Sequence, residues 1–248
     1  MTSRLPARAL CAALLVPAAL FLRCGPSDKP AAASAELAFV KQAVGRQLTS
    51  RMDLLSGQIA AFAGVVAADR EFSMKLFVDK DRSAPEVTEL AQKYLGPMAL
   101  SVLSITDSQY VILSCGHFPA NTGTVFSVAR NLAAAPAFVM DNVKGENVLT
   151  LQAKARFTIL DTAVFFACGG IAVGRDFCAG LACWPGYSVL VKKGAMVIGM
   201  DNVESISEVK GDTILLNNRA YPAASIPLPY AGEGDAPALL VVSNKPLR

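Results

Sequence analysis

Five side chains spread over the middle of the sequence have the chemistry to hold a small molecule. The guanidinium groups of Arg130 and Arg156 offer planar forks for a carboxylate. Tyr110 and Phe157 offer apolar ring faces, and Asp141 offers a charged acceptor. Each residue also has a structural interpretation, because either arginine could face solvent and the aspartate could form a turn. We predict these five as candidate ligand-binding residues.

The residues that could perform catalysis do not form a recognised motif. His117 is the only histidine and falls in a loop, where it could titrate near neutral pH, bind a ligand or play no special role. Asp141 or Asp161 and a serine or threonine could form a triad with it on paper, but no Gly-x-Ser-x-Gly sequence is present. Gly169 and Gly170 follow a predicted strand and are more typical of a bulge or a close packing contact than of a phosphate loop. We predict no catalytic residue and no enzyme activity within this chain.

The cysteines favour neither a metal site nor a cofactor. Cys115 and Cys168 fall on predicted strands, where they are either small buried apolar residues or disulfide partners. Cys178 and Cys183 are five positions apart near a helix end, which leaves their pairing open as well. No Cys-x-x-Cys sequence occurs, which argues against structural zinc, a dithiol redox centre and covalent haem. The prediction is therefore no metal and no cofactor.

A long helix should position everything that follows it. Apolar residues recur at spacings of three and four from Leu37 to Val66 with no intervening proline, which predicts one helix of about 30 residues that is roughly 45 Å long. Shorter helices are expected at 69–78 and 85–95, the second with a proline in its first turn.

Alternating apolar residues and turn residues predict two sets of strands after Gly96. Asp107 and Ser108 should form a hairpin turn in which the aspartate binds nearby backbone. The expected fold class is α+β, with a long N-terminal helix followed by two antiparallel-sheet modules. The predicted strands are 98–106, 109–115, 137–140, 147–158, 161–169, 187–191, 195–200, 212–217 and 238–242, with helices at 124–133 and 175–183.

The first 35 residues have the composition of an export leader and tether. Two arginines precede the apolar run 9–22, which is short for a membrane-spanning helix. Removal after the alanines of the 29–35 tether, retention as an anchor, and lipid attachment at Cys24 all remain open, although Arg23 stands where a lipoprotein signal has a small residue. Every alternative predicts an extracytoplasmic, periplasmic body, either free or anchored to the inner membrane.

The charge distribution argues against nucleic acid as a partner. The formal net charge is +3 in a chain of 248 residues, and the leader carries the whole surplus. The rest of the chain is balanced, so it lacks the basic footprint that binding to a phosphate backbone requires.

The order of elements resembles a double Cache, or PAS-like, sensor domain. The resemblance rests on the long helix, the strand 100–107, the glycine-containing loop after Cys115, and the Gly169-Gly170 strand that leads into Asp176-Phe177. Such domains form the extracytoplasmic part of bacterial sensor histidine kinases and chemoreceptors. The resemblance implies three parts: the leader 1–35, the long helix with a membrane-distal module at 36–174, and a smaller membrane-proximal module at 175–248.

What the resemblance implies about function is limited by two departures. The chain lacks the Arg-x-Trp-Tyr cluster with which amino-acid-binding members hold their ligand, and Trp184 lies in a later linker. No second apolar helix follows Arg248, so the chain is either a fragment of a receptor or a stand-alone protein. The expected function is small-molecule sensing for transmembrane signalling, with an unidentified ligand, contact with the membrane through the leader and a homodimer through the long helix. The alternative is a periplasmic lipoprotein that binds a partner protein or an envelope component.

Overall fold

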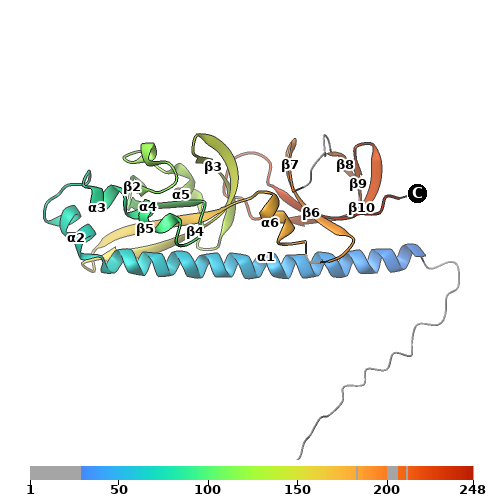
Figure 1. Cartoon of the computed structure of the whole chain (residues 1–248), viewed down its shortest axis with the longest axis horizontal. Coiled ribbons are helices and arrows are strands. Elements are labelled where there is room, and N and C mark those ends of the chain that lie inside the picture. Colours follow the sequence, from blue (N-terminus) through green and yellow to red (C-terminus); the bar gives the residue numbers. More distant parts are fainter. Residues whose placement is uncertain (1–28, 183, 200–205, 211, 248) are drawn as a thin grey trace, which may run out of the picture.

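The computed structural model describes residues 29–182, 184–199, 206–210 and 212–247. The leader before Lys29, the lipidation candidate Cys24 and Cys183 lie outside these ranges, so the interpretations made for them stay predictions. Figure 1 shows one long helix running beneath two sheets that lie side by side along it.

The long helix α1 spans Lys29–Ala68, which is 40 residues and about 60 Å at 1.5 Å per residue. Its predicted apolar stripe is buried from Leu37 to Val66 except at the half-buried Met52, and the helix packs against strands of both sheets. The helix ends where Asp69 caps the next helix, its Oδ1 accepting a hydrogen bond from the amide of Phe72 at 2.9 Å. No single helix of the described chain is long and apolar enough to cross a membrane, although α1 from Ser34 onward and the helix after it pass on length and composition as a pair bent by 62°.

The first sheet has five antiparallel strands in the order β2-β1-β5-β4-β3. Three short helices lie together at one end of this sheet, within the ranges 69–78 and 85–95 that the sequence predicts as helical, and the second range is divided into two helices at Glu89 (Figure 1). The elements are α2 (Arg70–Phe77), α3 (Pro85–Thr88), α4 (Leu90–Leu95), β1 (Val102–Asp107), β2 (Ile112–Cys115), η1 (Pro119–Asn121), α5 (Ser127–Asn131), β3 (Ala137–Val143), β4 (Glu146–Ile159) and β5 (Ala163–Ala172).

The second sheet has six strands in the order β7-β6-β11-β10-β9-β8. A short helix, α6, connects the two sheets. These elements are α6 (Arg175–Ala179), β6 (Tyr187–Lys193), β7 (Met196–Ile198), β8 (Ile206–Lys210), β9 (Thr213–Leu216), β10 (Arg219–Pro227) and β11 (Ala238–Ser243).

Two strands of the second sheet, β8 and β10, were absent from the sequence prediction. β10 contains Pro222 and Pro227, and proline inside a run argues against a central strand. Both prolines lie at positions in β10 where the missing backbone N–H is tolerated. Pro222 lies opposite Thr213, and Pro227 is the last residue of the strand, opposite Ala238. The prediction therefore placed four strands where the described chain has six.

The segment between β10 and β11 joins the second sheet to the first. The amide of Phe138 on β3 donates to the carbonyl of Pro229 at 2.7 Å, and the amide of Ala231 donates to the carbonyl of Phe138 at 3.0 Å. These bonds form a parallel bridge between Phe138 and Tyr230. We call residues 228–231 the strap.

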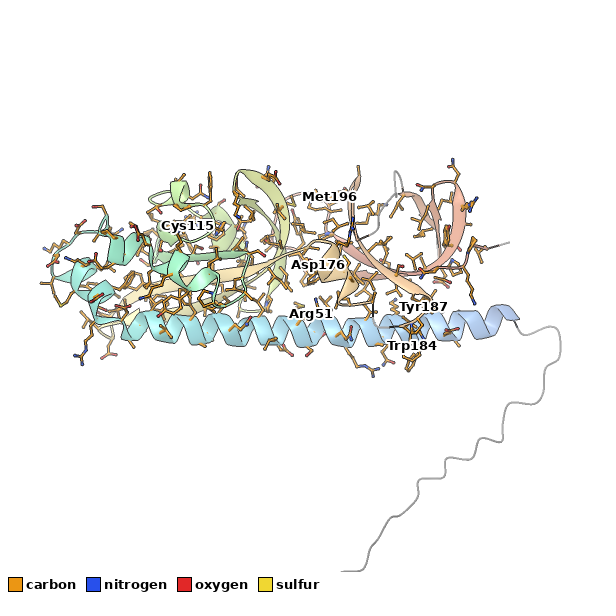
Figure 2. All side chains as sticks on the ribbon, in the orientation of Figure 1. Arg51, Cys115, Asp176, Trp184, Tyr187 and Met196 are labelled. Carbon is orange, nitrogen blue, oxygen red and sulfur yellow. The ribbon has the colours of Figure 1, made fainter. Side chains whose placement is uncertain are left out.

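The helix α6 is held between α1 and the first sheet. Arg51 of α1 donates to the carbonyl of Phe177 at 3.3 Å, and its guanidinium lies 5.5 Å from the centre of that ring. The Phe177 ring also packs edge-on against Phe138 at 6.1 Å. Figure 2 shows Arg51 reaching from α1 toward the helix that carries Asp176. Near the start of α1, Trp184 packs edge-on against Phe39 with ring centres 5.2 Å apart.

Candidate functional site

The candidate site lies on the face of the first sheet that is turned away from α1. Residues 116–136, which we call the cover segment, run over this face and include η1 and α5 (Figure 1). Phe126, Ala129 and Leu132 of the cover segment are buried against strand residues such as Cys168 and Val139. Figure 2 places Cys115 on this covered face, on the far side of the sheet from α1.

A network of buried polar side chains lies on this face. The Gln152 amide donates from Nε2 to Oδ2 of Asp141 at 2.6 Å and to Oγ1 of Thr150 at 3.0 Å. The Thr150 hydroxyl in turn donates to the carbonyl of Val139 at 3.2 Å. Because these groups are shielded from water, their hydrogen bonds fix the relative positions of β3 and β4.

His117 brings the cover segment into the same network. Its Nδ1 accepts a hydrogen bond from the amide of Leu103 at 3.2 Å, which places the ring proton on Nε2, 3.7 Å from Oδ2 of Asp141. Burial lowers the pKa of His117, against the opposing effects of the Asp141 carboxylate and of the Leu103 carbonyl oxygen, which lies 3.4 Å from Nδ1. His117 lies in a loop, as the sequence predicts, but its side chain is buried, with 7% exposure, and the lowered pKa favours its neutral form.

A second cluster beside the network combines cations with aromatic rings. Tyr110 and Phe166 stack with ring centres 5.0 Å apart and planes 9° from parallel. The ammonium of Lys154 lies 5.3 Å from the Tyr110 ring centre and 5.4 Å from that of Phe166, and it donates to the carbonyl of Ala129 at 2.8 Å. The guanidinium of Arg130 lies 5.8 Å from the Tyr110 ring centre. These are cation–π distances, which favour a cation held on a flat apolar wall.

An unpartnered hydroxyl lies close to this cluster. Thr106 is fully buried on the covered face, opposite Phe166 on β5 and Ile112 on β2. Its Oγ1 has no hydrogen-bond partner within the described residues. A buried hydroxyl without a partner costs about 1–3 kcal/mol, which makes Thr106 a position where a ligand atom would restore a lost interaction.

The structure brings four of the five predicted site residues to the covered face and separates the fifth. Tyr110, Arg130 and Asp141 lie in the two clusters, and exposed Arg156 follows Lys154 on the same side of β4, opposite Phe166. Phe157 is buried on the other face, toward α1, and stacks on Phe165 with ring centres 5.6 Å apart. Phe157 therefore belongs to the core of the first module.

Sequence reasoning overlooked several residues of the site. Among them are Thr106, Thr150, Gln152, Lys154 and Phe166. The signal that could have found three of them is the alternation along β4, where polar residues occupy every second position from 150 to 156 between small and apolar ones.

The thiols of the described chain are not activated. Cys115, Cys168 and Cys178 are free and buried. Cys115 Sγ lies 3.5 Å from Nδ1 of His117, but burial raises the pKa of this thiol to about 11. The sulfur next to the only histidine is therefore protonated at neutral pH, and Asp161 lies in the exposed turn between β4 and β5, away from this pair.

Neither metal ligation nor phosphate binding is supported at the positions that the sequence singled out. In the part of the chain that the structure describes, no three His, Cys, Asp or Glu side chains are placed to hold a metal ion. A Cβ on Gly169 would lie 2.5 Å from Cδ1 of Ile59, and one on Gly170 would overlap the carbonyl oxygen of Leu151. This confirms the packing interpretation of the two glycines.

Two surface hollows lie elsewhere in the molecule. One of about 600 Å³ lies among α2, α3 and α4 and has several acidic side chains, including Glu86 and Glu89. Another of about 580 Å³ lies between α1 and residues 226–229. Neither hollow is lined by any of the five predicted site residues.

The sequence matches no protein-family model and no curated protein. Solved structures nevertheless share the fold over most of the chain. The sensor domain of the Vibrio cholerae histidine kinase DctB aligns with a TM-score of 0.54 at 9% identity and covers 86% of this chain and 98% of that one. The periplasmic domain of Vibrio cholerae LuxQ gives 0.53 at 9% identity, with 84% and 100% covered. The extracellular domain of the putative histidine kinase vpHK1S-Z8 gives 0.52 at 11% identity, with 88% and 97% covered.

These likenesses define the class of fold. The chain has the double Cache architecture of sensor domains, in which two PAS-like sheets lie on one long helix. The resemblance inferred from element order is thus confirmed for the fold.

Proposed function

We propose that this chain is an extracytoplasmic small-molecule-sensing module for transmembrane signalling, the input end of a protein of the sensor histidine kinase or chemoreceptor type. The observation that carries the proposal is the covered polar face of the first sheet. There Asp141, Gln152 and His117 form a buried network beside the Lys154 and Tyr110 cluster and the unpartnered hydroxyl of Thr106. Small-molecule sites commonly combine a few buried polar groups with an apolar wall.

The arrangement of the two chain ends supports a membrane-attached sensor. Figure 1 shows that the described chain ends near the same end of the molecule at which α1 begins. A leader anchored in the inner membrane and an output segment after the second sheet would then meet the membrane on one side. In this arrangement 36–174 is the membrane-distal module and 175–248 the membrane-proximal one.

The route of the signal is proposed from the contacts between modules. A ligand on the covered face would bias the position of β3, which carries both Asp141 and the strap contact of Phe138. Phe138 also contacts Phe177, which Arg51 holds against α1. The change would be a population shift between two packings, driven by the ligand's preference for one of them.

A homodimer through α1 is also proposed. The outer side of this helix exposes Leu54 and Val65 together with the small residues Gly57, Ala61 and Gly64. Small residues on an exposed helix face let a second helix approach closely, so two copies could pair along this side.

A ligand screen tests the proposed function directly. The purified protein would be heated with organic acids, amines and sugars, and a specific ligand at a hundred times its Kd should add about 2.7 kcal/mol of stability. For a domain of this size that raises Tm by roughly 5 to 10 °C. Thr106→Val should weaken the response, because it removes the free hydroxyl. Absence of any response across all three classes would count against a sensing role.

A further inference from the structure

Lys154 is the side chain that ties the cover segment to β4. Its ammonium donates to the carbonyl of Ala129 in α5 at 2.8 Å, and Ala129 itself is fully buried. The bond therefore holds α5 down on the sheet, next to the stacked rings of Tyr110 and Phe166.

The charge on this face is unbalanced. Among the described residues, neither Lys154 nor Arg130 forms an ion pair, and Arg156 adds a third cation on the same side of β4. The carboxylate in the adjoining network, Asp141, already accepts from Gln152 at 2.6 Å. The face thus offers positive charge without a matching anion.

A neutral carbonyl is a weak partner for an ammonium group. A carboxylate on the same ammonium adds the attraction between two opposite full charges, which the carbonyl lacks, and partial burial strengthens that attraction further. The flat wall of Tyr110 and Phe166 would take the apolar part of such a molecule, and Thr106, whose hydroxyl has no partner among the described residues, lies opposite Phe166 on the neighbouring strand.

We propose that the site takes a small organic anion, whose carboxylate replaces the Ala129 carbonyl on Lys154 and thereby releases α5 from the sheet. This inference rests on the proposed sensing function and specifies the charge of its ligand and the contact that the ligand breaks. The exposed Arg130 at the rim would attract the anion before it reaches Lys154.

Calorimetry and thermal unfolding of the full chain test the ligand class. Benzoate, phenylacetate and succinate would each be compared at constant ionic strength with the neutral amides benzamide, phenylacetamide and succinamide. At least one acid should bind and raise Tm while its amide does not. Lys154→Met should weaken that binding at least tenfold. Lys144→Met, which removes the same charge from the exposed β3–β4 turn, should leave it unchanged.

Hydrogen exchange tests the release of α5 separately. Lys154→Met without any probe, and the wild type with a bound acid, should both exchange faster at the amide of Leu132, which bonds to Val128 across α5. Lys154→Gln provides a second neutral variant if the methionine variant folds poorly. Equal binding of acid and amide, undiminished binding by both neutral variants, or slower exchange in α5 on binding would each overturn the proposal. Binding of amines or sugars alone would overturn it and leave the sensing function standing, whereas no binding of any class would remove both.

Discussion

Phe138 on the edge strand of the first sheet and Tyr230 between two strands of the second form a parallel backbone bridge. The bridge uses two hydrogen bonds, and Phe138 packs on Phe177 at the same point. An edge strand would otherwise present unpaired backbone groups, so the strap both completes β3 and ties the two modules together.

The strap should make the two modules unfold together. Ala231→Pro removes the amide that donates to the Phe138 carbonyl and should destabilise the protein by about 1–3 kcal/mol. Ala231→Gly keeps that amide and should lose clearly less stability than the proline variant. Urea denaturation of both variants measures the difference, and the proline variant should also show a broadened or split transition. Equal stability of the two variants would contradict a coupling role for this bond.

The close approach of α1 to the first sheet should depend on Gly169. In Gly169→Ala the new methyl group would lie 2.5 Å from Cδ1 of Ile59 and 2.9 Å from Cδ1 of Leu103, so we expect a loss of about 1–3 kcal/mol as α1 is displaced. Gly96→Ala is the matched control, since Gly96 has helical backbone at the end of α4 and nothing lies within 4 Å of its Cβ. That change should stabilise the protein by about 0.4–1 kcal/mol, because it reduces the conformational freedom of the unfolded chain. Thermal unfolding of the two variants separates the cost of steric crowding from this effect.

Stability should fall on mild acidification because of His117. Its pKa is lowered in the folded protein, so the unfolded chain binds a proton more readily once the pH drops below about 6.5. The stability contributed by the neutral ring is therefore complete above that pH and is lost below it, with a slope of at most about 1.4 kcal/mol per pH unit. His117 is the only histidine, so His117→Asn should remove most of the change in unfolding free energy between pH 7.5 and 5.5, as measured by urea denaturation. An unchanged slope in the variant would show that the ring is not buried neutral.

Two threonines on the covered face should respond oppositely to the same change. Thr106→Val removes a buried hydroxyl that has no partner among the described residues, so we expect a gain of up to about 1 kcal/mol. Thr150→Val breaks bonds to Gln152 and to the Val139 carbonyl and should cost about 1–3 kcal/mol. Chemical denaturation without ligand compares them, and a loss for Thr106→Val would reveal an interaction that the hydroxyl makes in solution.

The elements that the sequence predicted best are those with a strong local pattern. The apolar periodicity of α1, β4 and β5 can be read directly from the sequence. Asp107 likewise accepts hydrogen bonds from the amides of Gln109 and Val111, as predicted for an aspartate in a turn. β10 was missed because its prolines are tolerated only through their place in the sheet, which is a tertiary property.

The candidate site was only partly predictable. Adjacent residues on a strand point to opposite faces, so Arg156 and Phe157 could not have shared one side of β4, and the alternation rule was sufficient to show it. The approach of His117 to Asp141 depends instead on the path of the cover segment, which joins β2 to β3, two strands that are consecutive in the sequence but lie at opposite edges of the sheet. No local sequence pattern predicts that His117 and Asp141 lie close together.

The contact between Trp184 and Phe39 provides an intrinsic fluorescent probe of the position of α1. Trp184 is the only tryptophan, so its emission arises from one place, where the linker before β6 meets the first turns of α1. Sliding of the helix past the second sheet would change the surroundings of that indole without any attached dye. Movement at the end far from the covered face can therefore be followed in the native chain by fluorescence alone.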